Sequence, residues 1–216
     1  MGIAARRSKI KDVKLLIFSD IHSNAKALQR LMSTEADYYF CAGDLVSWAR
    51  GLDAMGEILK QRADRVYVIP GNHESAEQVT AFCGKFGLHD FHGQRMEIAG
   101  YNVIGLGYSN PTPFETPGEY SEEELEERLH AFDGLHPMVA ICHVPPQGTM
   151  LDRITNLKHA GSRSMRAFLQ REKPAYFFCG HIHEAAGVSE SLGATLAMNV
   201  GPRGYLLQLP PETPPA

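Results

Sequence analysis

Residues 13–22 are VKLLIFSDIH, an apolar run of six residues that leads directly into Asp20 and His22. A short run that contains β-branched and aromatic residues and is bounded by turn residues predicts a buried strand over 13–18. The same arrangement recurs along the chain, at 38–42, 65–69, 138–142 and 175–179. The sequence therefore predicts five buried strands, each of which ends next to polar residues.

The segments between these runs have helical spacing or helix-favouring composition, and helices are predicted over 25–34, 52–63, 75–86, 121–131 and 163–172. Ser121 and Glu124 predict a capping box at the start of the fourth helix, and Ser162 is the expected cap of the fifth. Alternation of strands and helices predicts an α/β fold with parallel strands. The later stretches 95–108 and 187–209 have few helices between their strands, which predicts a second, more antiparallel sheet.

The composition is that of a soluble globular protein, with 44% hydrophobic and 21% charged residues. The formal net charge is −4, whereas a protein that grips long nucleic acids by their phosphates is normally basic. We therefore expect no stable binding of duplex nucleic acid. No window approaches 18 apolar residues, so no membrane span is predicted. The four cysteines form no CxxC pair and are expected to be small buried thiols in a reducing cytoplasm.

The length of 216 residues fits one domain. Residues 1–12 form a basic leader without the apolar run of a signal peptide, 13–209 form the domain, and 210–216 form a proline-rich tail that is expected to be flexible. Segment 109–118, SNPTPFETPG, is a long loop with three prolines. It is interpreted either as a functional loop or as a packed surface loop. The sequence leaves open whether the protein forms a homo-oligomer.

Candidate metal ligands follow all five predicted strands, at the carboxyl ends where parallel α/β sheets bind their ligands. They are Asp20, His22, Asp44, Asn72, His143, His181 and His183. Carboxylate, imidazole and amide oxygen together suit first-row ions such as Mn²⁺, iron or Zn²⁺. This recurrence predicts a shared metal site at one edge of the sheet.

Spacing within the motifs indicates how the ligands would meet. Residues i and i+2 of an extended segment point the same way, so Asp20 can converge with His22, and His181 with His183, if these segments are extended. Asp44, which follows its strand alone, is the candidate for bridging two ions. Glycines that adjoin the ligands allow the backbone to turn sharply and approach the site closely, and these are Gly43, Gly71 and Gly180.

The ordered blocks DxH, GD, GNHE, H and GHxH, from Asp20 to His183, resemble those of the calcineurin-like metallophosphoesterases. The segment HVPPQGTMLDRI…HAGS (143–162), GHIHE and the closing NVGPRGYLLQL are similar to small, single-domain prokaryotic members. The resemblance implies a four-layer α-β-β-α sandwich, with two mixed sheets flanked by helices and a dimetal site at one rim.

The resemblance also implies roles for individual residues. One ion would be held by Asp20, His22, Asp44 and His183, and the other by Asp44, Asn72, His143 and His181. Such a pair of cations lowers the pKa of a bridging water, and the resulting hydroxide would attack phosphorus. His73 would act as general acid towards the leaving group, as its counterpart does in the family, and Glu74 would orient its imidazole and keep it protonated. Alternatively, His73 only caps a helix start.

Departures from the family pattern bear on the substrate. The Ser/Thr protein phosphatases carry an arginine in GDxVDRG and another before GNHE, where this chain has Trp48 and Pro70. The sequence therefore favours a small phosphodiester or phosphomonoester over a phosphoprotein. The alternatives are a protein phosphatase and a non-catalytic scaffold that keeps the fold.

Four residues are candidates for contact with the substrate. Arg50 would replace a missing arginine, unless it is a solvated loop residue, and Phe114 would stack a base, unless it is buried in the core. His159 and Arg163 would touch phosphate, the latter near a helix N-terminus. Loop 109–118 and segment 148–162 are expected to form the walls of the pocket.

Overall fold

Apolar side chains occupy both faces of the first strand, β1 (Val13–Phe18), and each face is covered by a different layer. Leu16 and Phe18 pack against helices, whereas Leu15 and Ile17 pack against strands of a second sheet. A strand buried on both sides is a continuous apolar run in the sequence, which is the pattern that predicted it.

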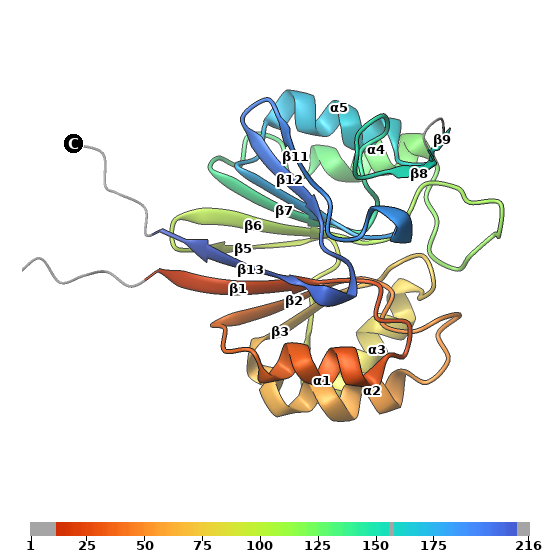
Figure 1. Cartoon of the computed structure of the whole chain (residues 1–216), viewed down its shortest axis with the longest axis vertical. Coiled ribbons are helices and arrows are strands. Elements are labelled where there is room, and N and C mark those ends of the chain that lie inside the picture. Colours follow the sequence, from red (N-terminus) through yellow and green to blue (C-terminus); the bar gives the residue numbers. More distant parts are fainter. Residues whose placement is uncertain (1–11, 156–157, 211–216) are drawn as a thin grey trace, which may run out of the picture.

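The computed structural model describes residues 12–155 and 158–210. Most of the predicted leader 1–12 and tail 210–216 therefore lies outside the described residues. Two sheets pack face to face, with helices on both outer surfaces (Figure 1). The predicted four-layer sandwich with two mixed sheets is confirmed.

The first sheet has the strand order β13-β1-β2-β3-β4. Its remaining strands are β2 (Tyr38–Ala42), β3 (Val66–Ile69), β4 (His89–Asp90) and β13 (Tyr205–Leu209). Strands β1 to β4 are parallel, and β13 pairs antiparallel with β1. Its outer face packs against α1 (Ala25–Ser33), α2 (Leu52–Leu59) and α3 (Ala76–Phe86), and α2 continues as the 3₁₀ helix η1 (Lys60–Arg65).

The second sheet has the order β11-β12-β10-β7-β6-β5. The strands are β5 (Gln94–Ile98), β6 (Tyr101–Leu106), β7 (Met138–Cys142), β10 (Tyr176–Cys179), β11 (Ser189–Leu192) and β12 (Thr195–Asn199). Its outer face packs against α4 (Glu122–His130) and α5 (Arg163–Glu172). The short 3₁₀ helices η2 (His183–Ala185) and η3 (Gly201–Arg203) lie in the loops near the end of the chain.

The second sheet is more antiparallel than the first, as expected, but only at its edges, where it has two antiparallel strand pairs against one in the first sheet. Its four central strands are parallel and only its two edge strands are antiparallel. Helices α4 and α5 are crossover connections that return the chain to the same edge, which makes β6, β7 and β10 parallel. The closing strand β13 joins the first sheet, where Leu207 and Leu209 are buried between the two sheets.

The helix starts follow the predicted capping chemistry. Ser121 and Glu124 form the capping box of α4, and Ser162 accepts a hydrogen bond from the N–H of Met165 at the start of α5. Ser75 forms a second capping box, at α3. Four cysteines are free and buried, as expected. Within the described residues, no helix is both long and apolar enough to cross a bilayer.

The carboxyl ends of five strands meet at one edge of the sandwich, on the right of Figure 1. Three of them, β1, β2 and β3, come from the first sheet, and two, β7 and β10, come from the second. A small hairpin of β8 (Arg153–Thr155) and β9 (Lys158–His159) lies at the same edge. Ligand-type side chains from both sheets therefore lie together at this edge.

Candidate metal centre

The seven predicted ligands lie together at this edge, and they form two groups. The first group is Asp20, His22 and His183, whose candidate ligand atoms all lie within 4.8 Å of one another. The Nε2 atoms of His22 and His183 are 2.9 Å apart, and His183 Nε2 is 3.6 Å from Asp20 Oδ1. Nitrogen and carboxylate lone pairs thus converge on one point.

The second group is Asp44, Asn72, His143 and His181. The Oδ1 atom of Asn72 lies 3.1 Å from His143 Nε2 and 2.8 Å from His181 Nδ1. The Oδ2 atom of Asp44 lies 3.5 Å from His143 Nε2. Three of these four side chains are at most 4% exposed, so the group is enclosed by the protein.

Asp44 links the two groups. Its Oδ2 atom is also 3.7 Å from Nε2 of His22, a member of the first group. One carboxylate that reaches both groups is the arrangement expected of a bridging ligand between two ions.

The donors fit transition-metal ions by their chemistry. His143 Nδ1 lies 2.8 Å from the carbonyl oxygen of Ala42, and His22 Nδ1 lies 3.0 Å from Ser47 Oγ. If each Nδ1 carries the proton of such a bond, the Nε2 lone pair of each ring faces the centre. Hydrogen-bond partners that fix the ring in this way are typical of metal-binding histidines.

The charges at the centre also favour a cation. Burial and the neighbouring His143 lower the pKa of His181 to about 4, so this ring is a neutral donor near pH 7. Burial raises the pKa of Asp44, but the imidazoles of His143 and His22 outweigh it, so the pKa is lowered and the carboxylate stays ionised. Burial lowers the pKa of His143, but the neighbouring carboxylate of Asp44 outweighs it and raises this pKa to about 9. The carboxylates therefore favour positive charge here, which a metal cation supplies.

The backbone at the ligands is not extended. Asp20, His22, Asp44 and His181 have φ values of 54°, 44°, 55° and 69°. The DxH and HxH segments do not meet the condition of extended backbone, because the chain turns immediately after each strand. Asp20 and His22 still share a group, whereas His181 and His183 belong to different ones. Left-handed backbone costs about 1–3 kcal/mol at such residues and is retained where the surroundings fix it.

Gly71 has the close approach that the sequence predicted. A Cβ at this position would lie 2.0 Å from Asp44 Oδ1 and 2.5 Å from the backbone nitrogen of Asp44. Gly43, with φ of 94°, would place a Cβ 2.5 Å from the Cα of Gly71. The loops after β2 and β3 can touch only because both positions lack a side chain.

Glu74 has a different role from the predicted one. Its buried carboxylate accepts hydrogen bonds from the backbone N–H groups of Asp44, Val46 and Gly71, at 3.1, 3.0 and 3.0 Å. The expectation that it orients His73 is wrong, because both of its oxygens hold the loops after β2 and β3 together. Glu74 is thus part of the frame of the centre.

His73 is half-buried beside the first group. One of its ring nitrogens lies within 4.8 Å of a ring nitrogen of His22 and of a carboxylate oxygen of Asp44. Its backbone N–H donates to Asp44 Oδ1 at 3.0 Å, and its Nδ1 accepts from the backbone N–H of Trp48 at 3.3 Å. The Trp48 ring meets the imidazole edge-on, with centroids 5.6 Å apart.

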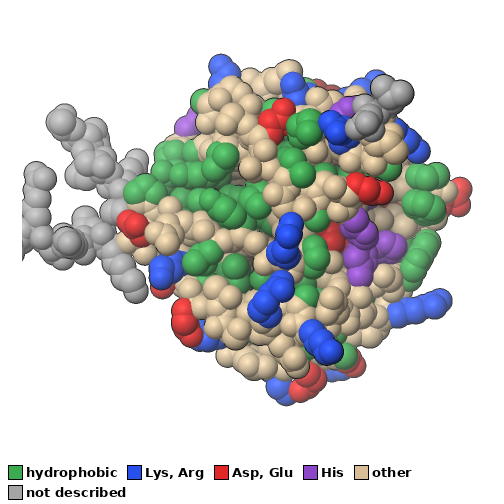
Figure 2. Space-filling view, in the orientation of Figure 1, with side chains coloured by type: hydrophobic (Ala, Val, Ile, Leu, Met, Phe, Trp, Pro, Cys, Tyr) green, Lys and Arg blue, Asp and Glu red, His purple; other side chains and the backbone are tan. Residues whose placement is uncertain are grey.

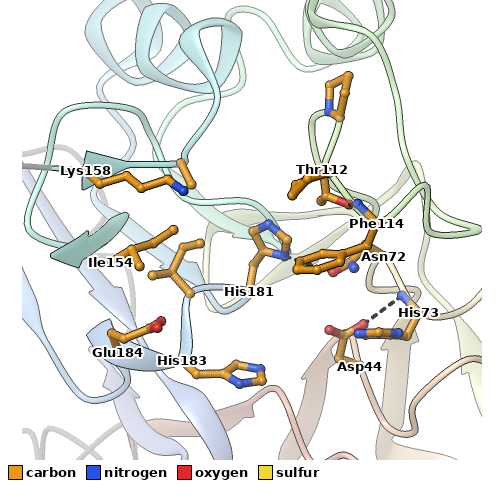
Figure 3. Close-up of a pocket in the computed structure, with 14 residues that line it drawn as sticks. Asp44, Asn72, His73, Thr112, Phe114, Ile154, Lys158, His181, His183 and Glu184 are labelled. Carbon is orange, nitrogen blue, oxygen red and sulfur yellow. Dashed lines mark hydrogen bonds between the residues drawn. The ribbon is translucent and has the colours of Figure 1, made fainter.

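A pocket of about 470 Å³ opens over the centre (Figure 3). Its floor includes metal-centre residues. Its walls come from loop 109–118 and from the region of the β8–β9 hairpin, as expected, and also from the segment after β10. The wall residues are Pro111, Thr112, Pro113, Phe114, Ile154, Lys158, Ala160, Ile182 and Glu184. Figure 2 shows the histidines gathered at this edge, beside apolar side chains.

Phe114 lies in the pocket wall and is 71% exposed, so it is not a core residue. Lys158 was missed by the sequence prediction, although its neighbour His159 was chosen. In a strand, adjacent side chains point to opposite faces. Lys158 lines the pocket, whereas His159 Nδ1 lies 2.7 Å from the buried carboxylate of Asp152. The alternation of side chains along a strand is the signal from which one could predict that only one of these two neighbours reaches the pocket.

Arg50 and Arg163 are exposed and are not among the described residues that line the pocket. The predicted phosphate contact at the start of α5 is wrong, because this helix end already holds a carboxylate. Glu122 accepts hydrogen bonds from Ser162 Oγ and from the backbone N–H groups of Arg163 and Ser164.

Comparison with known proteins agrees with the fold, which is a sandwich of the metallophosphoesterase type. The sequence model of the calcineurin-like phosphoesterase family matches residues 13–185, and the chain belongs to this family.

Among its relatives is an uncharacterized protein, MJ1162, of Methanocaldococcus jannaschii, which is 30% identical over 205 residues and covers 92% of each chain. The crystal structure of TT1561 of Thermus thermophilus matches with a TM-score of 0.69 and 20% identity, over 88% of this chain and 89% of that one. A dimetal phosphatase from Danio rerio matches with a TM-score of 0.58 and 11% identity, over 87% of each chain. At these identities the two structures show a shared fold.

Proposed function

We propose that this protein is a dimetal-dependent phosphoester hydrolase that acts on a small phosphodiester or phosphomonoester. The observation that carries the proposal is the pair of donor groups that share Asp44 at the floor of a pocket. A bound pair of cations would polarise the phosphoryl oxygens and acidify a water between them. Mn²⁺ and iron are the first candidates and Zn²⁺ is a further one, because all accept this mixture of donors.

His73 is proposed to donate the proton to the leaving group. Its Nδ1 accepts from the Trp48 N–H, so the proton of a neutral ring is carried by Nε2. A ring nitrogen that carries a proton cannot be a metal ligand, so the contact with Trp48 supports a hydrogen-bond donor at Nε2 over a ligand role. Transfer of a proton to the leaving oxygen requires the cationic imidazolium, in which Nδ1 also carries a proton and no longer accepts from Trp48.

The pocket supports a substrate with an organic group. Pockets of this size accommodate more than a phosphate ion. The walls offer the ring of Phe114 and the apolar side chain of Ile154. Among the described lining residues, Lys158 is the only lysine or arginine. A Ser/Thr protein phosphatase would be expected to offer arginines near the phosphate, so a small ester is favoured.

The proposal is tested by hydrolysis of bis-4-nitrophenyl phosphate and 4-nitrophenyl phosphate with Mn²⁺, iron or Zn²⁺, beside the variant Asp44→Asn. We expect the variant to lose more than about 100-fold in kcat/KM, since even loss of a residue that only orients a ligand costs about 10–100-fold. A wild-type protein no faster than Asp44→Asn with every metal would favour the scaffold alternative. A panel of 2′,3′- and 3′,5′-cyclic nucleotides would then define the substrate class.

A further inference from the structure

Loop 109–118 holds Asn72 at two points. The backbone N–H of Gly118 donates to the carbonyl oxygen of Asn72 at 2.9 Å, and Nδ2 of Asn72 donates to Thr116 Oγ1 at 3.1 Å. The loop lies directly against this segment, because a Cβ on Gly118 would come within 2.4 Å of the carbonyl oxygen of Gly71. The loop that carries Phe114 into the pocket wall is therefore fastened to a candidate metal ligand.

Glu119 organises the same loop. Its carboxylate accepts from the backbone N–H and hydroxyl of Thr112, at 3.1 and 2.6 Å, and from the backbone N–H of Thr116, at 2.8 Å. It also accepts from the Thr116 hydroxyl. These bonds lower the pKa of Glu119 although burial opposes them, so the carboxylate is ionised near pH 7 and only accepts.

The hydroxyl of Thr116 has a single hydrogen, which it donates in the hydrogen bond to Glu119. Towards Asn72 this hydroxyl can then only accept. Asn72 must present its NH₂ group to Thr116 and its Oδ1 atom to the opposite side, where His143 and His181 lie. The direction of one hydroxyl hydrogen therefore decides which end of the Asn72 amide faces the metal centre.

We propose that Thr116, oriented by Glu119, is a positioning residue for Asn72, so that the loop carrying Phe114 also sets a ligand of the metal centre. The inference rests on Asn72 being a metal ligand in the proposed function. A reversed amide would turn two N–H donors towards the centre, and an NH₂ group has no lone pair for a cation. Residues that hydrogen-bond to the ligands of a metal site orient them in this way.

The test compares three variants by calorimetric titration with Mn²⁺ and by the metal content of the purified protein. Thr116→Val keeps the shape of the side chain and loses the hydroxyl, whereas Thr116→Ser keeps the hydroxyl. Thr112→Val is the matched control, because the hydroxyl of Thr112 donates to the same carboxylate, whereas the hydrogen bond from Asn72 goes to Thr116. Melting temperatures of the metal-free proteins show whether each variant is folded.

We expect Thr116→Val to bind one of the two ions about 10–100-fold more weakly, the cost of losing a residue that orients a ligand. Thr116→Ser and Thr112→Val should retain the wild-type affinity for both ions. The proposal is overturned if Thr116→Val binds both ions as the wild type does, or if Thr112→Val loses as much as Thr116→Val.

Glu119→Gln tests the role of the carboxylate, because an amide in its place can donate to the hydroxyl and free the hydrogen of Thr116. We expect this variant to weaken the same ion as Thr116→Val, and unchanged affinity would show that Glu119 does not orient the hydroxyl. Metal affinity tests this inference and hydrolysis tests the proposed function, so the two proposals can fail separately. A wild type that binds two ions but hydrolyses nothing refutes the proposed function and leaves this inference standing.

Discussion

The floor and the walls of the pocket are built in different ways. Floor residues such as Asp44 and Asn72 come within three residues of the end of a strand and are at most 4% exposed. Wall residues such as Phe114 and Lys158 come from a long loop and a short hairpin and are exposed. The two sheets thus fix the ligands rigidly, whereas the surface that meets the substrate can vary without disturbing them. Thr116 is the exception, because it lies in loop 109–118 and accepts a hydrogen bond from Asn72 in the floor.

The largest effect of a substitution is expected at Gly71, where the floor of the pocket is closely packed. In Gly71→Ala, the added Cβ would overlap Asp44 Oδ1, so we expect loss of bound metal and of metal-dependent hydrolysis. Overpacking of this kind also costs about 1–3 kcal/mol of stability. Metal content, activity and the free energy of unfolding measure the three effects.

Gly84→Ala is the matched control, since Gly84 lies in α3 with open space around its Cβ direction. We expect wild-type metal content and a stability equal to or about 0.5–1 kcal/mol above that of the wild type. Equal loss of metal in both variants would refute the idea that close packing at Gly71 sets the floor.

His73 lies between floor and walls, and its effect should depend on the substrate. His73→Ala is expected to lose about 10²–10⁴-fold in rate on alkyl phosphoesters, the usual contribution of a general acid. On nitrophenyl esters the loss should be far smaller, because that leaving group departs without a proton. The rates of both esters are compared with metal content held equal. Equal losses on the two substrates would contradict the acid role and leave His73 as a ligand or a structural residue.

The smallest effect is expected in the wall. Phe114→Ala should raise KM for aryl or nucleoside esters roughly 2- to 13-fold, which corresponds to the about 0.5–1.5 kcal/mol of an aromatic pair. Metal content should be unchanged, and stability should change by less than about 0.5 kcal/mol, because the ring is exposed.

Leu196→Ala provides the control, since Leu196 is also an exposed large apolar residue but does not line the pocket. It should leave KM as in the wild type. An unchanged KM in Phe114→Ala for every aryl ester tested would remove Phe114 from the substrate site.

The residues that follow strands were predictable because the carboxyl end of a parallel strand is a fixed place in the fold. Asp44 and His143 come from different sheets, yet each could be located by its position after a buried run. The roles of Glu74 and Arg163 could not be predicted from their positions in the sequence. The sequence predicts that Glu74 acts on its neighbour His73, but its buried carboxylate accepts hydrogen bonds from backbone amides of two loops. The helix end beside Arg163 is filled by Glu122, which lies far from it in the sequence.

The sequence by itself determined the alternation of strands and helices and the set of ligand-type residues, because periodicity and motif order are properties of the chain alone. The layered fold followed from the resemblance of these motifs to a known family. Only the tertiary structure decided the distances within each ligand group, which side chains face the pocket, and that Thr116 contacts Asn72. These relations depend on backbone turns after the strands and on contacts between distant segments, for which one sequence carries no local signal.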